Sequence, residues 1–103
     1  MIYNKLIRDK IPEILDMKGL NYTSYVADDE EYEQKLKDKL QEEIQEFYEN
    51  PCILEMADIL EVLDAISKFY GFDKYVVETE KANKQWTRGS FEDRIILEEV
   101  EDK

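Results

Sequence analysis

The chain has 103 residues and a formal net charge of −12, because 26 Asp and Glu outnumber 14 Lys and Arg; it has no histidine and one cysteine. This length fits a single domain spanning residues 1–103. The lack of histidine excludes Ser-His-Asp and Cys-His triads and imidazole metal sites within the chain, and a lone cysteine excludes a structural zinc finger. The strong negative charge argues against a nucleic-acid polymer as the main partner, because duplex affinity comes mainly from Lys and Arg.

The sequence predicts a cytoplasmic protein with no membrane partner. Its apolar runs are a few residues long, far short of the ~20 that a membrane-spanning helix needs. No basic-then-apolar leader opens the chain. Cys52 has no second cysteine with which to form an internal disulfide, which fits a reducing compartment.

Helix start and stop signals divide the chain into four expected helices. Pro12 is placed early in the first, where its missing N–H costs little, and Gly19 ends it. Pro51 breaks the chain between two long helices, because the residue before a proline avoids helical geometry. Gly71 and Gly89 follow the last two helices. The four expected helices span about residues 11–18, 28–49, 53–70 and 73–87.

Two further segments are less regular. Residues 22–27 include Tyr22, Thr23, Tyr25 and Val26, which is compatible with a minor β element. The tail, residues 91–100, mixes apolar and charged residues and fits either a short helix or an extended segment. The two long helices joined at Asn50-Pro51 predict an antiparallel hairpin, so the expected fold is an all-α helical bundle built on that hairpin.

The second expected helix carries a carboxylate on its apolar side. At about 100° per residue, the apolar stripe consists of Leu36, Leu40, Ile44 and Phe47. Glu43 falls inside this stripe and Glu46 at its edge, one turn further on.

The third expected helix is apolar over most of its circumference. Its polar arc contains Glu61, Asp64 and Lys68, yet Glu55 and Asp58 project on the opposite side, around Val62. Burying an unpaired carboxylate costs several kcal/mol, so two together call for a reason.

Each helix therefore presents an i, i+3 pair of acids on one face. Antiparallel packing would bring the two pairs together, and an all-oxygen site without histidine or thiolate suits Mg²⁺ or Mn²⁺. Two alternatives stay open: these acids are ordinary surface residues of an acidic chain, or they are buried against Lys or Arg of a neighbouring helix. The predicted metal ligands are Glu43, Glu46, Glu55 and Asp58.

The acidic pattern also resembles a known family. Residues 42–46, Glu-Glu-Ile-Gln-Glu, followed by residues 55–58, Glu-Met-Ala-Asp, resemble the E-E-x-x-E … E-x-x-D signature of the MazG-like, all-α NTP pyrophosphatases. The opening residues 3–12 and the segment around residues 88–98 resemble the two ends of a small subgroup described as phosphoribosyl-ATP pyrophosphohydrolase-like. The resemblance thus touches nearly the whole chain.

This resemblance implies Mg²⁺-dependent cleavage of a nucleoside triphosphate between the α and β phosphates, giving a monophosphate and pyrophosphate. It places the ligands at the same four acids; Glu42 matches a position that is less clearly a direct ligand. A carboxylate such as Glu42 or Glu46 would take the proton from the attacking water. The short spacing between Glu46 and Glu55 leaves little room for an inserted segment that recognises the nucleobase of the substrate.

Phosphate charge also needs fixed cations, and the chain offers few. The basic residues near the N-terminus could instead cap the first helix, and those of the fourth helix could form surface ion pairs. The candidate substrate-binding residues are Lys5, Arg8, Lys10, Lys81, Lys84, Arg88 and Arg94.

A function of a different class is also compatible with the sequence. A chain this small with one helix apolar nearly all round is expected to form a homodimer or homotetramer. The alternative to the enzyme is therefore a non-catalytic helical module that oligomerises or binds a nucleotide without turnover.

Overall fold

The computed structural model describes residues 1–102, and its secondary structure within these residues consists of four helices without a strand. The helices are α1 (Ile11–Met17), α2 (Asp29–Glu49), α3 (Ile53–Phe69) and α4 (Lys74–Arg88). This confirms the all-α class. The chain divides into two compact units, Met1–Gly71 and the part that begins at Phe72.

The helix ends follow the local signals of the sequence. The Asp28 side chain accepts a hydrogen bond of 2.9 Å from the backbone N–H of Glu31 and thereby caps α2. Asp73 caps α4 in the same way through the N–H groups of Tyr75 and Val76. Gly71, with φ of +71°, follows α3 in the left-handed conformation that glycine adopts without strain.

The expected β element at residues 22–27 is absent, so this prediction is wrong. The segment is irregular and mostly exposed, and no other part of the described chain forms a strand with which it could pair. Its tyrosines are held by acids nearby in sequence instead: Tyr22 donates to Asp16 at 3.1 Å and Tyr25 to Glu31 at 2.6 Å. A single extended segment without a partner strand forms no ladder. Residues 94–102 of the tail are likewise neither helix nor strand.

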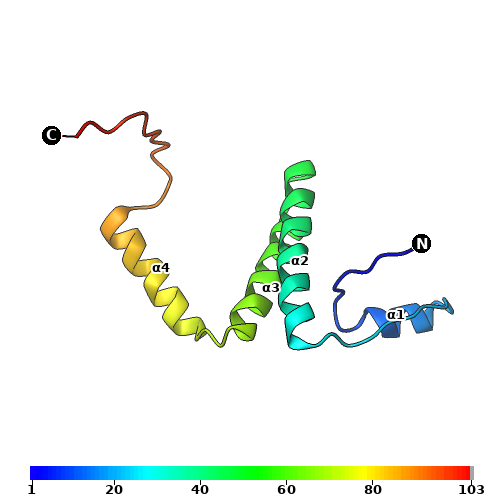
Figure 1. The fold of residues 1–103 in the computed structure, drawn as a ribbon. Coiled ribbons are helices and arrows are strands. Elements are labelled where there is room, and N and C mark those ends of the chain that lie inside the picture. The colour runs from blue at the N-terminus through cyan, green and yellow to red at the C-terminus, as the bar shows by residue number, and fades with distance from the viewer. Residues whose placement is uncertain (103) are drawn as a thin grey trace. The chain divides into compact units, whose positions relative to one another are not determined.

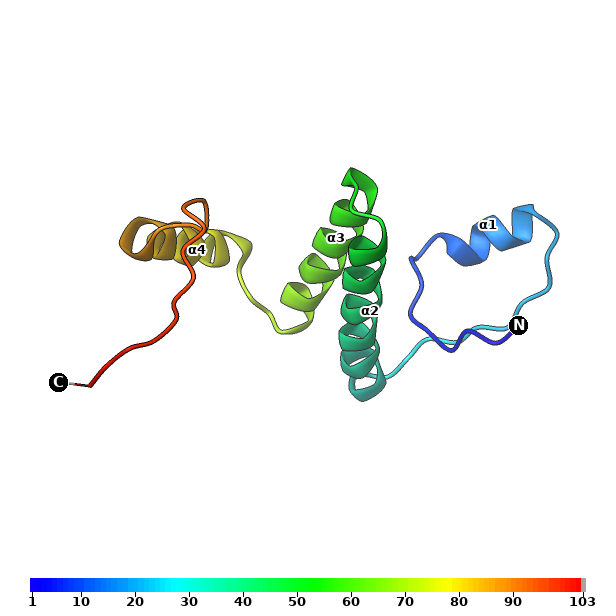
Figure 2. The same ribbon diagram turned by 90° about the horizontal axis from the view of Figure 1, so that it is seen from above.

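Helices α2 and α3 pack against each other and run antiparallel, as both ribbon views show (Figure 1, Figure 2). The Tyr32 ring near the start of α2 meets the Phe69 ring at the end of α3 edge to face, with centroids 5.6 Å apart. Leu36 and Val62, which are 2% and 8% exposed, are the most buried apolar side chains between the two helices. The hairpin is therefore the structural centre of the first unit.

Much of the apolar surface of α3 that α2 does not cover is exposed in the single chain. Of its apolar side chains only Val62 is buried, and Ile53, Leu54 and Leu60 are more than half exposed. Only the face of α3 toward α2 is covered by the first unit.

No helix among the described residues combines the length and apolar character required to cross a lipid bilayer.

Candidate metal centre

Four carboxylates meet on the facing sides of α2 and α3. Glu43 and Glu46 come from α2, one turn apart, and Glu55 and Asp58 come from α3, also one turn apart. One carboxylate oxygen of each residue lies within 4.8 Å of one oxygen of each of the others. The four predicted ligands are thus brought together, because antiparallel packing sets the end of α2 beside the start of α3.

Glu43 is the most buried of these acids. Only 6% of the residue is exposed, and it lies on the same side of α2 as Leu36. Its Oε1 is 3.4 Å from the Lys39 Nζ, but its Oε2 is buried and has no hydrogen-bond partner. Glu55 Oε2 is buried and unpartnered as well. Buried carboxylate oxygens normally accept from a donor or contact a cation, so the position of these two oxygens suits a cation.

The electrostatics of the cluster disfavour an ionised Glu43. Burial, followed by the negative charge of Glu46, raises the pKa of the Glu43 carboxyl, and the attraction of Lys39 only partly offsets this. A divalent cation between the carboxylates would reverse this effect by favouring their charged form.

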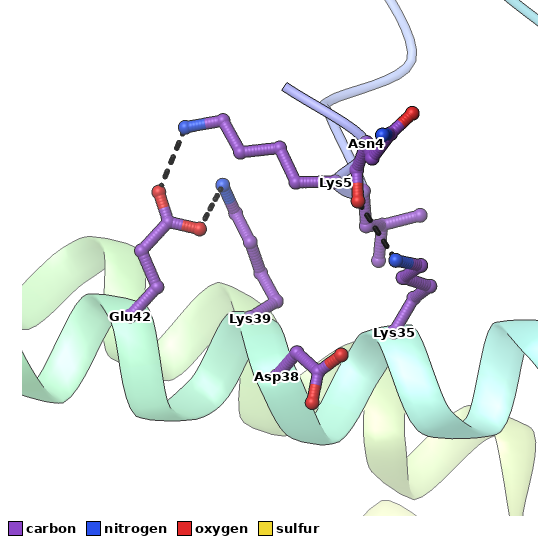
Figure 3. A pocket seen from close by; sticks show the side chains of 7 residues that line it. Asn4, Lys5, Lys35, Asp38, Lys39 and Glu42 are labelled. Carbon is purple, nitrogen blue, oxygen red and sulfur yellow. Dashed lines mark hydrogen bonds and ion pairs between the residues drawn. The ribbon is translucent and has the colours of Figure 1, made fainter. Parts of the chain in front are cut away.

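Three basic residues border the cluster. Lys5 Nζ lies 2.9 Å from Glu42 Oε1, and Arg8 Nη2 lies 2.7 Å from Asp58 Oδ1. Lys39 Nζ lies 3.4 Å from Glu42 Oε2 in addition to its contact with Glu43. Both oxygens of Glu42 are therefore occupied by lysines, which converge on it in the close view (Figure 3).

The ion pair between Lys5 and Glu42 shifts both groups toward their charged forms. The hydrogen bond to Glu42 raises the pKa of Lys5 despite its partial desolvation. For Glu42, burial acts to raise the pKa, but the two lysines together outweigh burial and lower it. Glu42 is consequently an anion fixed by lysines beside the four-acid cluster.

A small cavity of about 30 Å³ lies between the N-terminal segment and α2. Lys35 closes one side of it by donating a 2.7 Å hydrogen bond to the backbone carbonyl of Asn4 (Figure 3). The cavity has room for water but is far below the 300 Å³ or more of a typical small-molecule pocket. Its lining consists of Asn4, Lys5, Leu6, Lys35, Asp38, Lys39 and Glu42.

The predicted cations are distributed over both units. Lys5 and Arg8 reach the acidic residues of the hairpin, whereas Lys10 is exposed and forms no ion pair with any residue in the described part of the chain. The remaining candidates are exposed and belong to the second unit, three on α4 and one after it; they are Lys81, Lys84, Arg88 and Arg94.

Sequence reasoning missed two residues of this region. Lys39 stands three residues before Glu42 and four before Glu43, so the spacing rule for helical ion pairs could have identified it. Lys35 binds a backbone carbonyl 31 residues away, for which the sequence holds no signal.

The donor set fits a hard divalent cation. Four carboxylates supply only oxygen ligands, which Mg²⁺ and Mn²⁺ prefer, and two of their oxygens are buried without a partner. No protein-family model, curated protein or solved structure was found to match this chain. The resemblance to the MazG-like proteins therefore stays a prediction.

Proposed function

We propose that this protein is a MazG-like, Mg²⁺-dependent nucleoside triphosphate pyrophosphohydrolase, with Mn²⁺ as an alternative ion. The observation that carries this proposal is the group of four carboxylates with two buried, unpartnered oxygens. A −12 chain repels a triphosphate unless a cation bridges the two, and this group is suited to hold one. The single cysteine favours a reducing compartment, so we place the reaction in the cytoplasm.

In this proposal the metal ligands are Glu43, Glu46, Glu55 and Asp58. A bound Mg²⁺ would neutralise charge on the phosphate oxygens and lower the pKa of a coordinated water. The chain's own residues would orient that water and accept its proton. We favour Glu46 over Glu42 as the proton acceptor, because both oxygens of Glu42 are held by Lys5 and Lys39.

We propose that Lys5 and Arg8 contribute positive charge next to the phosphates. Both reach acids beside or within the cluster, so they lie where a bridged phosphate would be bound. Lys10, Lys81, Lys84, Arg88 and Arg94 are further candidates for phosphate binding.

A panel of the eight common (d)NTPs with Mg²⁺ tests the activity, with monophosphate and pyrophosphate both measured. The parent should release the two products in equal amounts from at least one nucleotide. Asp58→Asn should lose nearly all activity, whereas Glu61→Gln, which removes an exposed charge from the same helix, should retain it. Equal activity of Asp58→Asn and the parent would refute the assigned site.

The stability of Asp58→Asn distinguishes a metal site from a structural ion pair. Arg8 and Asp58 are 58% and 36% exposed, so breaking their ion pair should cost at most about 1 kcal/mol in metal-free protein. A buried structural pair would instead cost about 3–5 kcal/mol when one partner is removed. A strongly destabilised variant that still turns over substrate would favour the structural reading.

We propose that the chain forms a homodimer or homotetramer. The exposed apolar side chains of α3, such as Ile53, Leu54 and Leu60, support this, since a surface of this kind is normally covered in solution. The same observation favours the second candidate function, a non-catalytic oligomerisation or nucleotide-binding module. Light scattering should give at least twice the monomer mass; oligomerisation without turnover of any nucleotide in the panel would favour the second function.

A further inference from the structure

The segment 4–8 is attached to the helical hairpin by three polar contacts from two helices. The carbonyl of Asn4 accepts from Lys35, and the Lys5 ammonium pairs with Glu42, both on α2. Arg8 pairs with Asp58 on α3, at 2.7 Å and across 50 positions of sequence. Asn4 adopts the left-handed conformation, with φ of +48°, which asparagine tolerates better than most residues. The segment thus pairs one cation with an acid of each helix of the hairpin.

The contacts of Lys5 and Arg8 differ in kind. Glu42 is beside the four-acid cluster, so Lys5 forms its ion pair outside the proposed ligands and attracts Glu43 and Glu46 only at longer range. Asp58 is a member of the cluster, and the Arg8 guanidinium lies within hydrogen-bond distance of its carboxylate. A divalent cation held by the cluster would be close to that guanidinium and would repel it. The repulsion is only partly screened, because the separation is shorter than the Debye length of about 10 Å.

We propose that Arg8 is an internal counter-ion of the carboxylate cluster and that divalent-metal binding displaces it from Asp58. This inference rests on the proposed function, since it requires the cluster to hold a metal. Arg8 thereby lowers the metal affinity of the substrate-free protein, because binding must break a charge-assisted hydrogen bond. The released guanidinium remains tethered next to the site by the contacts of Asn4 and Lys5, where it meets an incoming phosphate group.

Direct Mn²⁺ binding to the full-length chain, measured by calorimetry and by the EPR signal of free Mn²⁺, tests the proposal without turnover. Arg8→Gln should bind Mn²⁺ about three- to tenfold more tightly than the parent, the range expected for removal of a partly exposed charged hydrogen bond. Lys37→Gln is the matched control, because it makes the same change in net charge at an exposed residue of α2 that forms no ion pair among the described residues. This variant should change the Mn²⁺ affinity by less than about twofold. Arg8→Lys keeps the charge and should stay close to the parent.

A second measurement reports the displacement itself. Hydrogen exchange or backbone amide NMR of residues 5–9 should change when Mn²⁺ or Mg²⁺ is added to the parent, and should change much less in Arg8→Gln. An affinity of Arg8→Gln equal to that of Lys37→Gln, or weaker than that of the parent, would overturn the role of Arg8 and leave the metal site standing. Absence of binding in the parent and in every variant would overturn the metal site, the proposed function and this inference together.

Discussion

Replacing Glu43 by Gln is the most direct perturbation of the proposed centre, because Glu43 combines the deepest burial with an unpartnered oxygen. The substitution keeps the shape of the side chain and removes one of four negative charges whose oxygens lie within 4.8 Å of one another. Two carboxylates at that distance repel by about 0.9 kcal/mol at the dielectric constant of water and by about 3.5 kcal/mol at an effective value of 20.

The net gain is smaller than the sum of these repulsions. Glu43 also attracts Lys39 at 3.4 Å, and this attraction is lost in the variant, although Lys39 retains Glu42 as a partner. We therefore expect metal-free Glu43→Gln to be more stable than the parent by about 1–3 kcal/mol, and to bind divalent metal much more weakly. Gain of stability with loss of function is expected where function keeps like charges together.

Urea unfolding in the presence of a chelator measures this stability, and calorimetry with Mn²⁺ measures the binding. Glu61→Gln is the matched control, since it removes the same charge from an exposed position on α3 and should shift stability by less than about 0.5 kcal/mol. A Glu43→Gln variant that is less stable than the parent would refute the reasoning, because it would show that the Glu43 carboxylate contributes a favourable structural interaction.

Three further outcomes follow from the same geometry. Mg²⁺ at ten times its dissociation constant should raise the melting temperature by about 5–10 °C, and an unchanged melting curve between chelator and millimolar Mg²⁺ would contradict the site. The pKa of the Glu43 carboxyl is raised above 4.5, so the folded chain takes up this proton at a higher pH than the unfolded chain. The stability advantage of Glu43→Gln over the parent should therefore be full above the raised pKa and shrink as the pH falls toward 4.5. A difference in stability that does not change with pH in metal-free urea melts would contradict this prediction. Leu36→Ala should destabilise the chain by about 2–4 kcal/mol in such melts, since Leu36 is 2% exposed between α2 and α3, and a loss below 1 kcal/mol would indicate that the hairpin is not the core.

Local rules were sufficient to predict the helices and the four-acid cluster. Capping aspartates, Pro51 and the left-handed glycines mark the ends of the helices, and the predicted boundaries agree with the structure to within about one residue. The cluster required only two more steps, the i, i+3 spacing on each helix and antiparallel packing about the short connection. Each step depends on neighbours in sequence, so the sequence alone was enough.

One structural prediction failed because its outcome depends on a partner segment that the local sequence does not specify. Residues 22–27 have the composition of a strand, but a strand exists only when another segment pairs with it. The apolar character of α3 predicts that this helix is covered by a second copy of the chain; the first unit covers only one of its faces, so coverage of the rest stays a prediction. The amino-acid composition of a segment shows which secondary structures it can adopt, whereas the segments that pack against it determine which one it forms.

The ion pairs of the N-terminal segment with the hairpin also depend on residues far apart in the sequence, so local sequence rules could not predict them. Lys5 and Arg8 could be named as candidate cations, but their acidic partners lie 37 and 50 positions further along the chain. Helical spacing cannot reveal such pairs, and the same two cations could equally have capped the first helix. The structure instead sets one of them on Asp58, within the cluster. Arg8 therefore balances part of the negative charge of the four-acid cluster. If the cluster holds a metal as we propose, its metal affinity should depend on this residue, which the acidic signature does not contain.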